Sequence, residues 1–321
     1  MSKIALGVGA SHSTLMNTNW ESVADVPAAL RFRQGLEEAA TVIAAARPDA
    51  VVVIGSNHFR GFFLDLMPAI TIGVAEVAGA GEAGTPGGPL PVDTDLARHI
   101  VDSLVADEFD VAFSLRLQVD HGITHSLQYL VPNLDVPIVP VVLNMFAPPL
   151  PTLRRCHSLG AAIRRAVDAD GTGKRVVVIA SGGLSHRLPW PKWFETFSDD
   201  DRFLVKAWLN GRQSWREYEV RRRHIIQSAE PDINQAFDRR FLDLLSAGRL
   251  GELAEYTNDQ VEAEAGNGGQ EIRSWIAMAA AVGPSQGRTL AYAPLPQWLT
   301  GMAVALVEPR PTAASADPDW S

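Results

Sequence analysis

The sequence predicts an α/β fold in which helices flank a largely parallel or mixed central sheet, as in a three-layer sandwich. Two observations support this prediction. Several short apolar runs lack polar alternation, which is typical of strands covered on both faces. These runs alternate along the first half of the chain with segments of helical periodicity, which favours strands joined by helices. After about residue 190, helical segments follow one another, so we expect a helical C-terminal region packed on the same sheet.

The first strands and helices are expected where these patterns lie. The continuous apolar runs cover residues 4–8, 50–55, 137–143 and 175–180, with weaker runs at 70–75 and 111–115. Helical periodicity covers residues 27–48, 92–106 and 152–168, and Pro48 marks the end of the first of these segments. The Gly- and Pro-rich segment 79–91 is expected to be a projecting loop that could shape a pocket.

The second half of the chain is expected to be mainly helical between residues 190 and 285. Its helices are predicted at 199–210, 216–229, 231–247, 249–265 and 269–283, and strands return only at "LAYAPL" or "AVALVE". Because no linker interrupts the chain, we expect a single α/β domain over residues 1–310. Residues 311–321 lack apolar periodicity and are expected to form a disordered tail.

Composition excludes several classes of function. The formal charge of −9 and the pI near 5.4 disfavour a nucleic-acid partner, which would need a basic surface. A single cysteine, Cys156, cannot form a disulfide within the chain, which fits a reducing compartment. No apolar run approaches the about 20 residues needed to cross a bilayer. We therefore expect a soluble, cytoplasmic protein without a membrane partner.

Three of the apolar runs end in a histidine. The stretches "KIALGVGASH", "AVVVIGSNH" and "KRVVVIASGGLSH" place His12, His58 and His186 just after predicted strands. A single loop histidine is more often satisfied by the backbone than functional. If the three strands are parallel neighbours, however, their histidines meet beyond the carboxyl ends, where ligands bind in helix-flanked sheets. We therefore predict a shared site.

Two further motifs remain ambiguous on residue chemistry alone. In "LQVDHGITH", His121 and His125 would share one helix face, but Gly122 and the absence of a glutamate make this a weak metal motif. In "GNGGQEIRSW", Asn267 resembles a helix cap, and Glu271 would lie in the first helical turn. A carboxylate is favourable there without any further role.

The motifs as a set resemble the type III (LigB-like) extradiol ring-cleavage dioxygenases. The stretches that carry the resemblance occur in the family's order: "ASHSTLM", "IGSNHFRGFF", "LQVDHGI", "ASGGLSH" and "GQEIRSW". Further similarity in "PLPVDTDLA" and "PLPQWLTGM" lies outside the catalytic motifs, and the resemblance extends over most of residues 1–305.

The resemblance implies a non-haem Fe(II) site formed by His12, His58 and Glu271. Two imidazoles and one carboxylate leave open positions on the ion for a catechol and O₂. The resemblance also implies that His121 and His186 carry out acid–base chemistry, for which an imidazole is suited. We expect His186 to be the base on the substrate side and His121 to be the acid near bound oxygen.

Supporting residues are expected around this site. The residues expected to support the metal ligands or to bind the substrate are Asp120, Asn57, His125, Arg60 and Arg187. Asp120 is expected to orient His121. Asn57 stands where the family commonly has Asp, which removes a negative charge beside the metal. We hypothesise that Arg60 or Arg187 pairs with a substrate carboxylate, the alternative being two solvated arginines at the pocket rim.

The resemblance thus implies an enzyme of aromatic catabolism that inserts both atoms of O₂ into a catechol ring by meta-cleavage. We expect a substrate with an acidic group, and a homo-oligomer. Two alternatives remain. A zinc hydrolase could use the same three ligands, and a non-catalytic binding module could share the scaffold. The presence of both His121 and His186 argues against a binding module.

Overall fold

A mixed sheet of nine strands forms the centre of the computed structural model, which describes residues 2–192 and 195–310. The predicted tail, 311–321, lies outside the described residues. The strands are β1 (Lys3–Ala10), β2 (Ala50–Ser56), β3 (Ile70–Ala80), β4 (Gly87–Leu90), β5 (Ala112–Val119), β6 (Ile138–Leu143), β7 (Arg175–Ser181), β8 (Gly287–Leu295) and β9 (Thr300–Val307). Their order is β4-β3-β6-β2-β7-β1-β9-β8, and β5 pairs with β3.

The four central strands β6, β2, β7 and β1 run parallel to one another. Strand β9 pairs antiparallel with β1, and β8 pairs antiparallel with β9 at the edge of the sheet. On the other side, β3 pairs antiparallel with β6 and β4. The predicted helix-flanked sheet with mixed strand directions is therefore confirmed. The two strands expected near the C-terminus are also confirmed, as β8 and β9.

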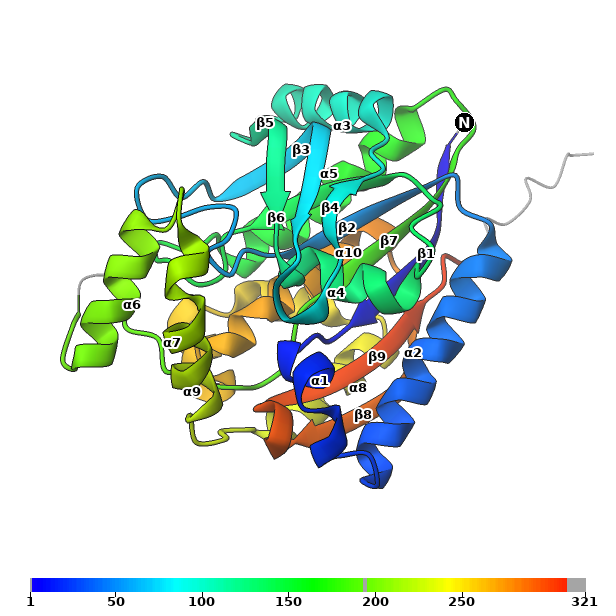
Figure 1. The fold of residues 1–321 in the computed structure, drawn as a ribbon. Coiled ribbons are helices and arrows are strands. Elements are labelled where there is room, and N and C mark those ends of the chain that lie inside the picture. Colours follow the sequence, from blue (N-terminus) through cyan, green and yellow to red (C-terminus); the bar gives the residue numbers. More distant parts are fainter. Residues whose placement is uncertain (1, 193–194, 311–321) are drawn as a thin grey trace, which may run out of the picture.

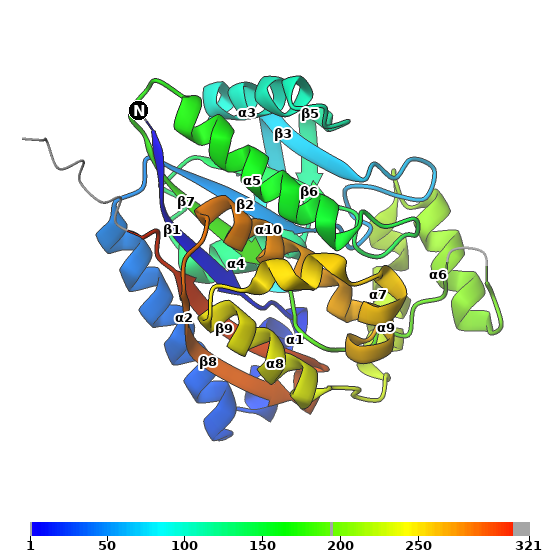
Figure 2. The same ribbon diagram turned by 180° about the vertical axis from the view of Figure 1, so that it is seen from behind.

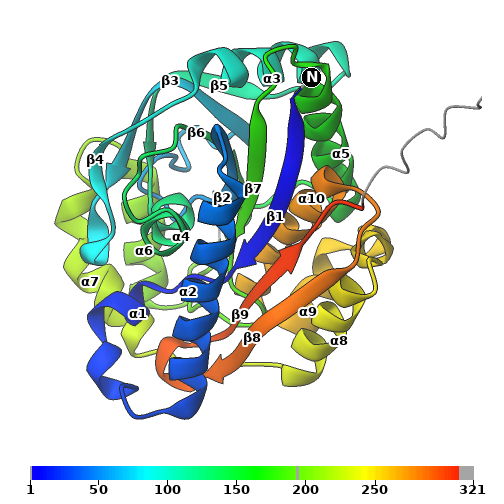
Figure 3. The ribbon, with the colours of Figure 1, turned by 90° about the vertical axis from the view of Figure 1, so that its right-hand side faces the viewer.

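Helices cover both faces of the sheet (Figures 2 and 3). Helices α2 (Pro27–Ala46) and α4 (His121–Leu130) cover one face. The opposite face is covered by α3 (Thr94–Ala106), α5 (Leu153–Ala169), α8 (Gln235–Ser246) and α10 (Ile272–Val282). Successive strand residues alternate between the two cores, so that Val51 belongs to the core under α2 and α4, and Val52 belongs to the core under α5 and α10. None of the described helices combines the length and apolarity that a membrane span requires.

Helices α6 (Asp199–Asn210) and α7 (Trp215–Gln227) stand to one side of the sheet (Figure 1). They enclose a third, smaller apolar cluster that includes Phe59, Phe63, Trp208 and Trp215. Phe59 and Phe63 belong to the segment that follows β2, so this cluster attaches α6 and α7 to the carboxyl end of the sheet. Two short helices, α1 (Thr14–Thr18) and α9 (Asn258–Ala265), complete the surroundings of the strand ends.

The structure corrects three local predictions. Segment 79–91 is not a projecting loop but completes a hairpin, because β4 pairs with the end of β3 across a short 3-10 turn at Glu82–Gly84. The helix expected at 249–265 divides into a 3-10 helix at Leu250–Glu255 and α9, because the Thr257 side chain caps α9 afresh. Asn267 does not cap a helix, since its side chain instead bonds both the N–H and the carbonyl of Leu188.

Candidate metal centre

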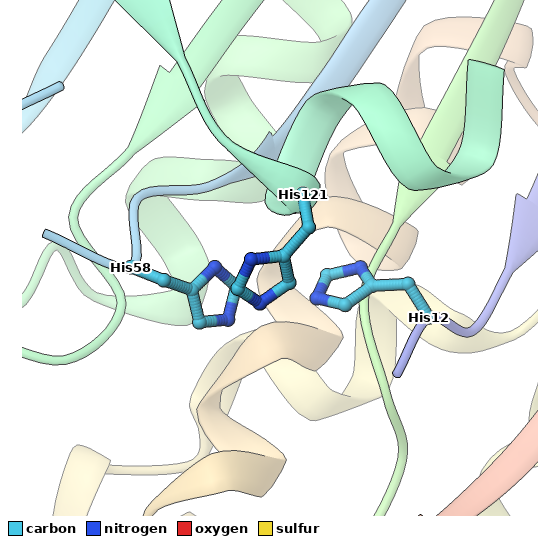
Figure 4. A group of neighbouring side chains, drawn as sticks. All are labelled: His12, His58 and His121. Atoms are coloured by element: carbon cyan, nitrogen blue, oxygen red, sulfur yellow. The ribbon is translucent and has the colours of Figure 1, made fainter. Parts of the chain in front are cut away.

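The strand ends bring the predicted site residues together. β1 and β2 both pair in parallel with β7, so the three strands whose ends carry histidines are neighbours, as predicted. Their histidines His12, His58 and His186 line one cavity together with His121 and Glu271. Figure 4 shows His12, His58 and His121 extending from three separate segments toward a common centre.

Two imidazoles converge on one carboxylate oxygen. Nε2 of His12 lies 3.2 Å from Oε1 of Glu271, and Nε2 of His58 lies 3.4 Å from the same oxygen. All three residues are at most 5% exposed. Ligand nitrogens of His12, His58 and His121 also lie within 4.8 Å of one another. The arrangement therefore offers up to four donors that a single metal ion could use.

His12 is oriented by a short chain of hydroxyl groups. Its Nδ1 lies 2.9 Å from Oγ of Ser181, the last residue of β7, and Ser126 on α4 donates to the same Oγ at 2.7 Å. With Nδ1 held in this way, Nε2 faces Glu271. Residues from β7 and α4 thus fix the orientation of an imidazole that follows β1.

His58 is oriented by Asp120, the N-cap of α4. Oδ2 of Asp120 accepts from the backbone N–H of His58 at 2.6 Å, and Oδ1 lies 3.3 Å from His58 Nδ1. We expected Asp120 to orient His121, so this partner differs from the prediction. The contact depends on a close approach of β2 and α4. A Cβ on Gly55 would lie 2.0 Å from the carbonyl oxygen of Gly122, and only glycine fits there.

Glu271 is anchored through both of its carboxylate oxygens. Oε1 accepts from the Ser56 hydroxyl at 2.5 Å, and Oε2 accepts from the backbone N–H of Gly183 at 2.7 Å. Glu271 ends a 3-10 turn that leads directly into α10, and Trp275 on that helix donates to the carbonyl of Gly182. The carboxylate is thereby held between the ends of β2 and β7.

The charges of these groups stabilise one another. Burial alone would raise the pKa of Glu271, but the charges of His12 and His58 and their hydrogen bonds hold it well below its usual value. Burial lowers the pKa of His58, but hydrogen bonds to Asp120 and Glu271 outweigh this effect and raise it to about 9. The site therefore favours positive charge beside Glu271, which a metal cation would also supply.

His121 has a carboxylate partner that sequence reasoning missed. Oε1 of Glu82 accepts from the backbone N–H of His121 at 2.7 Å and lies 2.8 Å from its Nδ1. Glu82 lies in the turn between β3 and β4 and is almost fully buried. One signal could have identified it, because Glu82 is the only charged residue in segment 79–91.

His121 and His186 are both arranged as neutral bases. Burial, reinforced by His58, lowers the pKa of His121 well below its usual value, and burial also lowers that of His186. Nδ1 of His186 lies 2.9 Å from the carbonyl oxygen of Leu184, which can only accept. Nδ1–H of each imidazole thus has an acceptor in the protein. Nε2 of each is left with its lone pair.

His125 and Asn57 are buried beside His12 and His58 but lie outside the convergent group. The ring of His125 lies 6.2 Å from that of His12, and burial lowers its pKa to about 3. The Asn57 side chain stabilises the loop after β2, because Oδ1 accepts from the N–H of Phe62 and Nδ2 donates to its carbonyl. An aspartate could not make the second of these bonds.

The two arginines predicted to bind substrate lie in different environments. Arg60 lines the cavity, and its guanidinium group donates to both oxygens of Glu219, at 2.9 and 2.7 Å. Arg187 is exposed, pairs with Asp232, and is not among the residues that line the cavity.

The cavity in front of His12, His58 and Glu271 contains about 770 Å³ of empty space, including its opening to solvent. Leu15, Leu188, Trp190 and Trp298 form apolar parts of its wall, and α7 contributes charged side chains. An apolar cavity with a few convergent polar groups is the usual form of a small-molecule site. Its apolar wall and convergent polar groups suit an aromatic ring with a polar substituent.

Comparison with known proteins assigns the chain to a class. The family model described as the catalytic LigB subunit of aromatic ring-opening dioxygenase matches residues 7–303, and the chain belongs to this family. It is therefore a metal-dependent extradiol ring-cleavage dioxygenase of aromatic catabolism that opens a catechol-type ring. The alternatives of a zinc hydrolase and a binding module are not supported.

Particular relatives are similar over most of their length. The chain is 36% identical over 280 residues to a 2,3-dihydroxyphenylpropionate/2,3-dihydroxicinnamic acid 1,2-dioxygenase of Cupriavidus necator, covering 83% of this chain and 87% of the relative. It is 34% identical to the enzyme of the same name from Rhodococcus jostii, covering 92% and 95%. An uncharacterised protein of Escherichia coli K12 of known structure is 14% identical, with a TM-score of 0.53 over 94% of this chain and 99% of that chain, and this similarity concerns the fold alone.

Proposed function

We propose that the chain is an Fe(II)-dependent dioxygenase that inserts both atoms of O₂ into a catechol by meta-cleavage, with His12, His58 and Glu271 as the iron ligands. One observation carries the proposal: Nε2 atoms of both histidines lie within 3.4 Å of one oxygen of Glu271 in a buried site. Two imidazoles and one carboxylate are the donor set typical of non-haem Fe(II) oxygenases.

The donor chemistry of the site fits a divalent cation. The Nδ1 atoms of His12 and His58 have partners in Ser181 and Asp120, so each Nε2 is the nitrogen available for coordination. Glu271 supplies one buried negative charge, because the pKa of its carboxyl group is held low. When bound, Fe(II) would allow electrons to pass from a chelated catecholate to O₂, which the side chains alone cannot do.

His186 is proposed to be the base on the substrate side. Its Nε2 carries a lone pair, because Nδ1 is committed to the Leu184 carbonyl, and its lowered pKa keeps the ring neutral. A neutral imidazole can accept a proton from the catechol hydroxyl as the diol binds. His186 also lines the cavity, so the substrate can reach it.

His121 is proposed to take up a proton transiently and return it during ring opening. Burial and His58 disfavour its imidazolium, so a proton on Nε2 is readily given up. The Glu82 carboxylate at Nδ1 opposes this effect while the proton is held. His186 has only a carbonyl oxygen at the equivalent place. This difference supports our assignment of His121 as the acid and His186 as the base.

The proposed substrate is a catechol that carries an acidic group. The names of the relatives specify a dihydroxyphenylpropionate, which has a carboxylate on a short side chain. Arginines on the cavity wall supply the complementary charge. The expected homo-oligomer and cytoplasmic location stay predictions, and a measurement of molecular mass in solution tests the first.

The test is anaerobic reconstitution with Fe(II), followed by a panel of catechols with and without acidic side chains. We expect O₂ uptake in proportion to substrate and a ring-opened product that absorbs in the visible range. The variant H12Q should lose iron and activity. The matched variant H125Q should keep both, because His125 is an equally buried imidazole outside the ligand group. A protein that binds zinc in preference to iron and consumes no O₂ with any catechol would refute the proposal.

A further inference from the structure

One face of α7 forms a wall of the cavity. The α7 residues that line it are spaced three and four positions apart, as one helix face requires: Glu219, Arg222, Arg223, Ile226 and Gln227. The neighbouring Arg221 lies outside this stripe, is exposed, and pairs with Asp200. Three consecutive arginines therefore have different environments, and two of them face the substrate cavity.

The single α7 carboxylate on this wall is already committed. Both carboxylate oxygens of Glu219 accept from Nη2 of Arg60, at 2.9 and 2.7 Å, which makes a close, charge-assisted ion pair. Arg223 reaches the same carboxylate only once, at 3.3 Å. Because Glu219 neutralises Arg60, the guanidinium group of Arg223 keeps most of its donors free.

Arg222 adds a second positive charge without a counter-ion. It is 4% exposed, and its donors reach the backbone carbonyls of His58 and Phe59. No carboxylate forms an ion pair with it among residues 2–192 and 195–310. A buried charge that lacks a partner is costly, so the cavity beside Arg222 is favourable for an anion.

We propose that Arg222 and Arg223 form the anion-binding end of the substrate cavity and that Arg223 contacts the carboxylate of the substrate side chain. At its α7 end, the cavity wall carries the guanidinium groups of Arg60, Arg222 and Arg223 and the carboxylate of Glu219. The other carboxylate that lines the cavity, Glu271, lies among the histidines. The excess of positive charge at the α7 end selects acidic over neutral catechols. The inference rests on the proposed function, because it assigns the substituent of the same aromatic substrate.

The first experiment measures selectivity during turnover. We compare kcat/KM for 3-(2,3-dihydroxyphenyl)propionate and for its neutral amide, in the iron-loaded wild type and in R223Q. In the wild type the acid should be preferred. In R223Q, kcat/KM for the acid should fall about 10- to 100-fold, the value of a charge-assisted hydrogen bond, while that for the amide stays unchanged. R223K should restore part of the preference, since it keeps the charge.

The matched control is R221Q, which removes an adjacent arginine on the same helix that does not line the cavity. Its selectivity should equal that of the wild type. If R223Q lowers kcat/KM equally for the acid and the amide, Arg223 acts only on structure and the inference is wrong. It is also wrong if R223Q keeps the wild-type preference.

A second experiment separates the inference from the proposed function. Binding of 3-phenylpropionate and 3-phenylpropionamide, which have no ring hydroxyls, is measured calorimetrically with the metal-free protein. The wild type and R221Q should bind the acid more tightly than the amide, and R223Q should bind both alike. Loss of the preference only in R223Q supports the anion site even if no catechol is turned over. If the wild type binds the acid and the amide equally well, the proposed anion site is wrong.

Discussion

Oε1 of Glu82 faces two donors of a single residue, the backbone N–H and the Nδ1 of His121, at 2.7 and 2.8 Å. The first contact fixes the start of α4, and the second fixes the orientation and tautomer of the imidazole. A carboxylate in the turn between β3 and β4 thus determines which nitrogen of His121 is available to the cavity. His58 stacks against the same ring at a centroid distance of 3.9 Å, so His121 has little freedom to rotate.

The variant E82Q is expected to slow turnover without loss of iron. The amide keeps the size of the side chain and can still accept hydrogen bonds, but it removes the charge that stabilises a protonated His121. We expect kcat to fall roughly 10- to 100-fold, as for other partners of active-site histidines. The control is E76Q, which removes an exposed carboxylate of β3 that pairs with Arg116 on the surface. Equal kcat values for E82Q and the wild type would contradict the proposed role of His121.

The hydroxyl chain from Ser126 through Ser181 to His12 predicts an effect on metal affinity. In S181A, Nδ1 of His12 loses its partner, so the imidazole can turn away from Glu271. The Kd for Fe(II) should rise roughly 10- to 100-fold. S126A, one step further from the imidazole, should have a smaller effect. Anaerobic titration with Fe(II) measures both values, and an unchanged Kd in S181A would show that the chain does not orient a ligand.

Gly268 leaves room for the ring of His186. A Cβ at this position would lie 2.2 Å from Nε2 of His186, so G268A must displace the imidazole or the turn that leads to Glu271. We expect a loss of about 1–3 kcal/mol in the free energy of unfolding. A displacement of about 1 Å should lower kcat roughly 100-fold. G171A is the control, since a Cβ there meets nothing within 4 Å. Denaturant unfolding and steady-state kinetics of both variants test the prediction.

Much of the fold could be predicted because continuous apolar runs report burial on both faces of a strand. The predicted boundaries of strands β1, β2 and β7 are therefore nearly correct. Their parallel pairing places their carboxyl ends at one edge of the sheet. The shared location of His12, His58 and His186 followed from that geometry. The hydrogen-bond partners of these histidines could not be predicted, because hydrophobic periodicity does not show which buried polar groups contact one another.

Glu82 and Arg223 illustrate this limit. Glu82 reaches His121 from 39 positions away, and only because β4 folds back on β3. Arg223 belongs to a run of charged residues that resembles a solvated helix face, yet α6 and α7 dock so that it faces the cavity. Asp120 contacts His58 because β2 and α4 approach closely, which Gly55 and Gly122 permit.

Asp238 connects the helical region to the loop that carries His186. It is fully buried on α8, where it accepts from the backbone N–H of Ser185 and from the hydroxyl of Tyr292, each at 2.8 Å. Ser185 immediately precedes His186, so Asp238 helps to place the proposed base. Burial raises the pKa of Asp238 to about 6, despite these hydrogen bonds, which lower it.

The raised pKa of Asp238 predicts a pH-dependent stability that D238N should lack. Because the folded protein holds this proton more tightly than the unfolded chain, the stabilisation is complete below the ordinary pKa of 3.8 and is lost as the pH rises through about 6. This shift in pKa corresponds to a contribution on the order of 3 kcal/mol to the free energy of unfolding. Denaturant unfolding between these pH values should show the wild type losing stability relative to D238N, whereas D243N, which changes an exposed residue of α8, should follow the wild type. A constant difference between D238N and the wild type across this range would show that Asp238 does not titrate there.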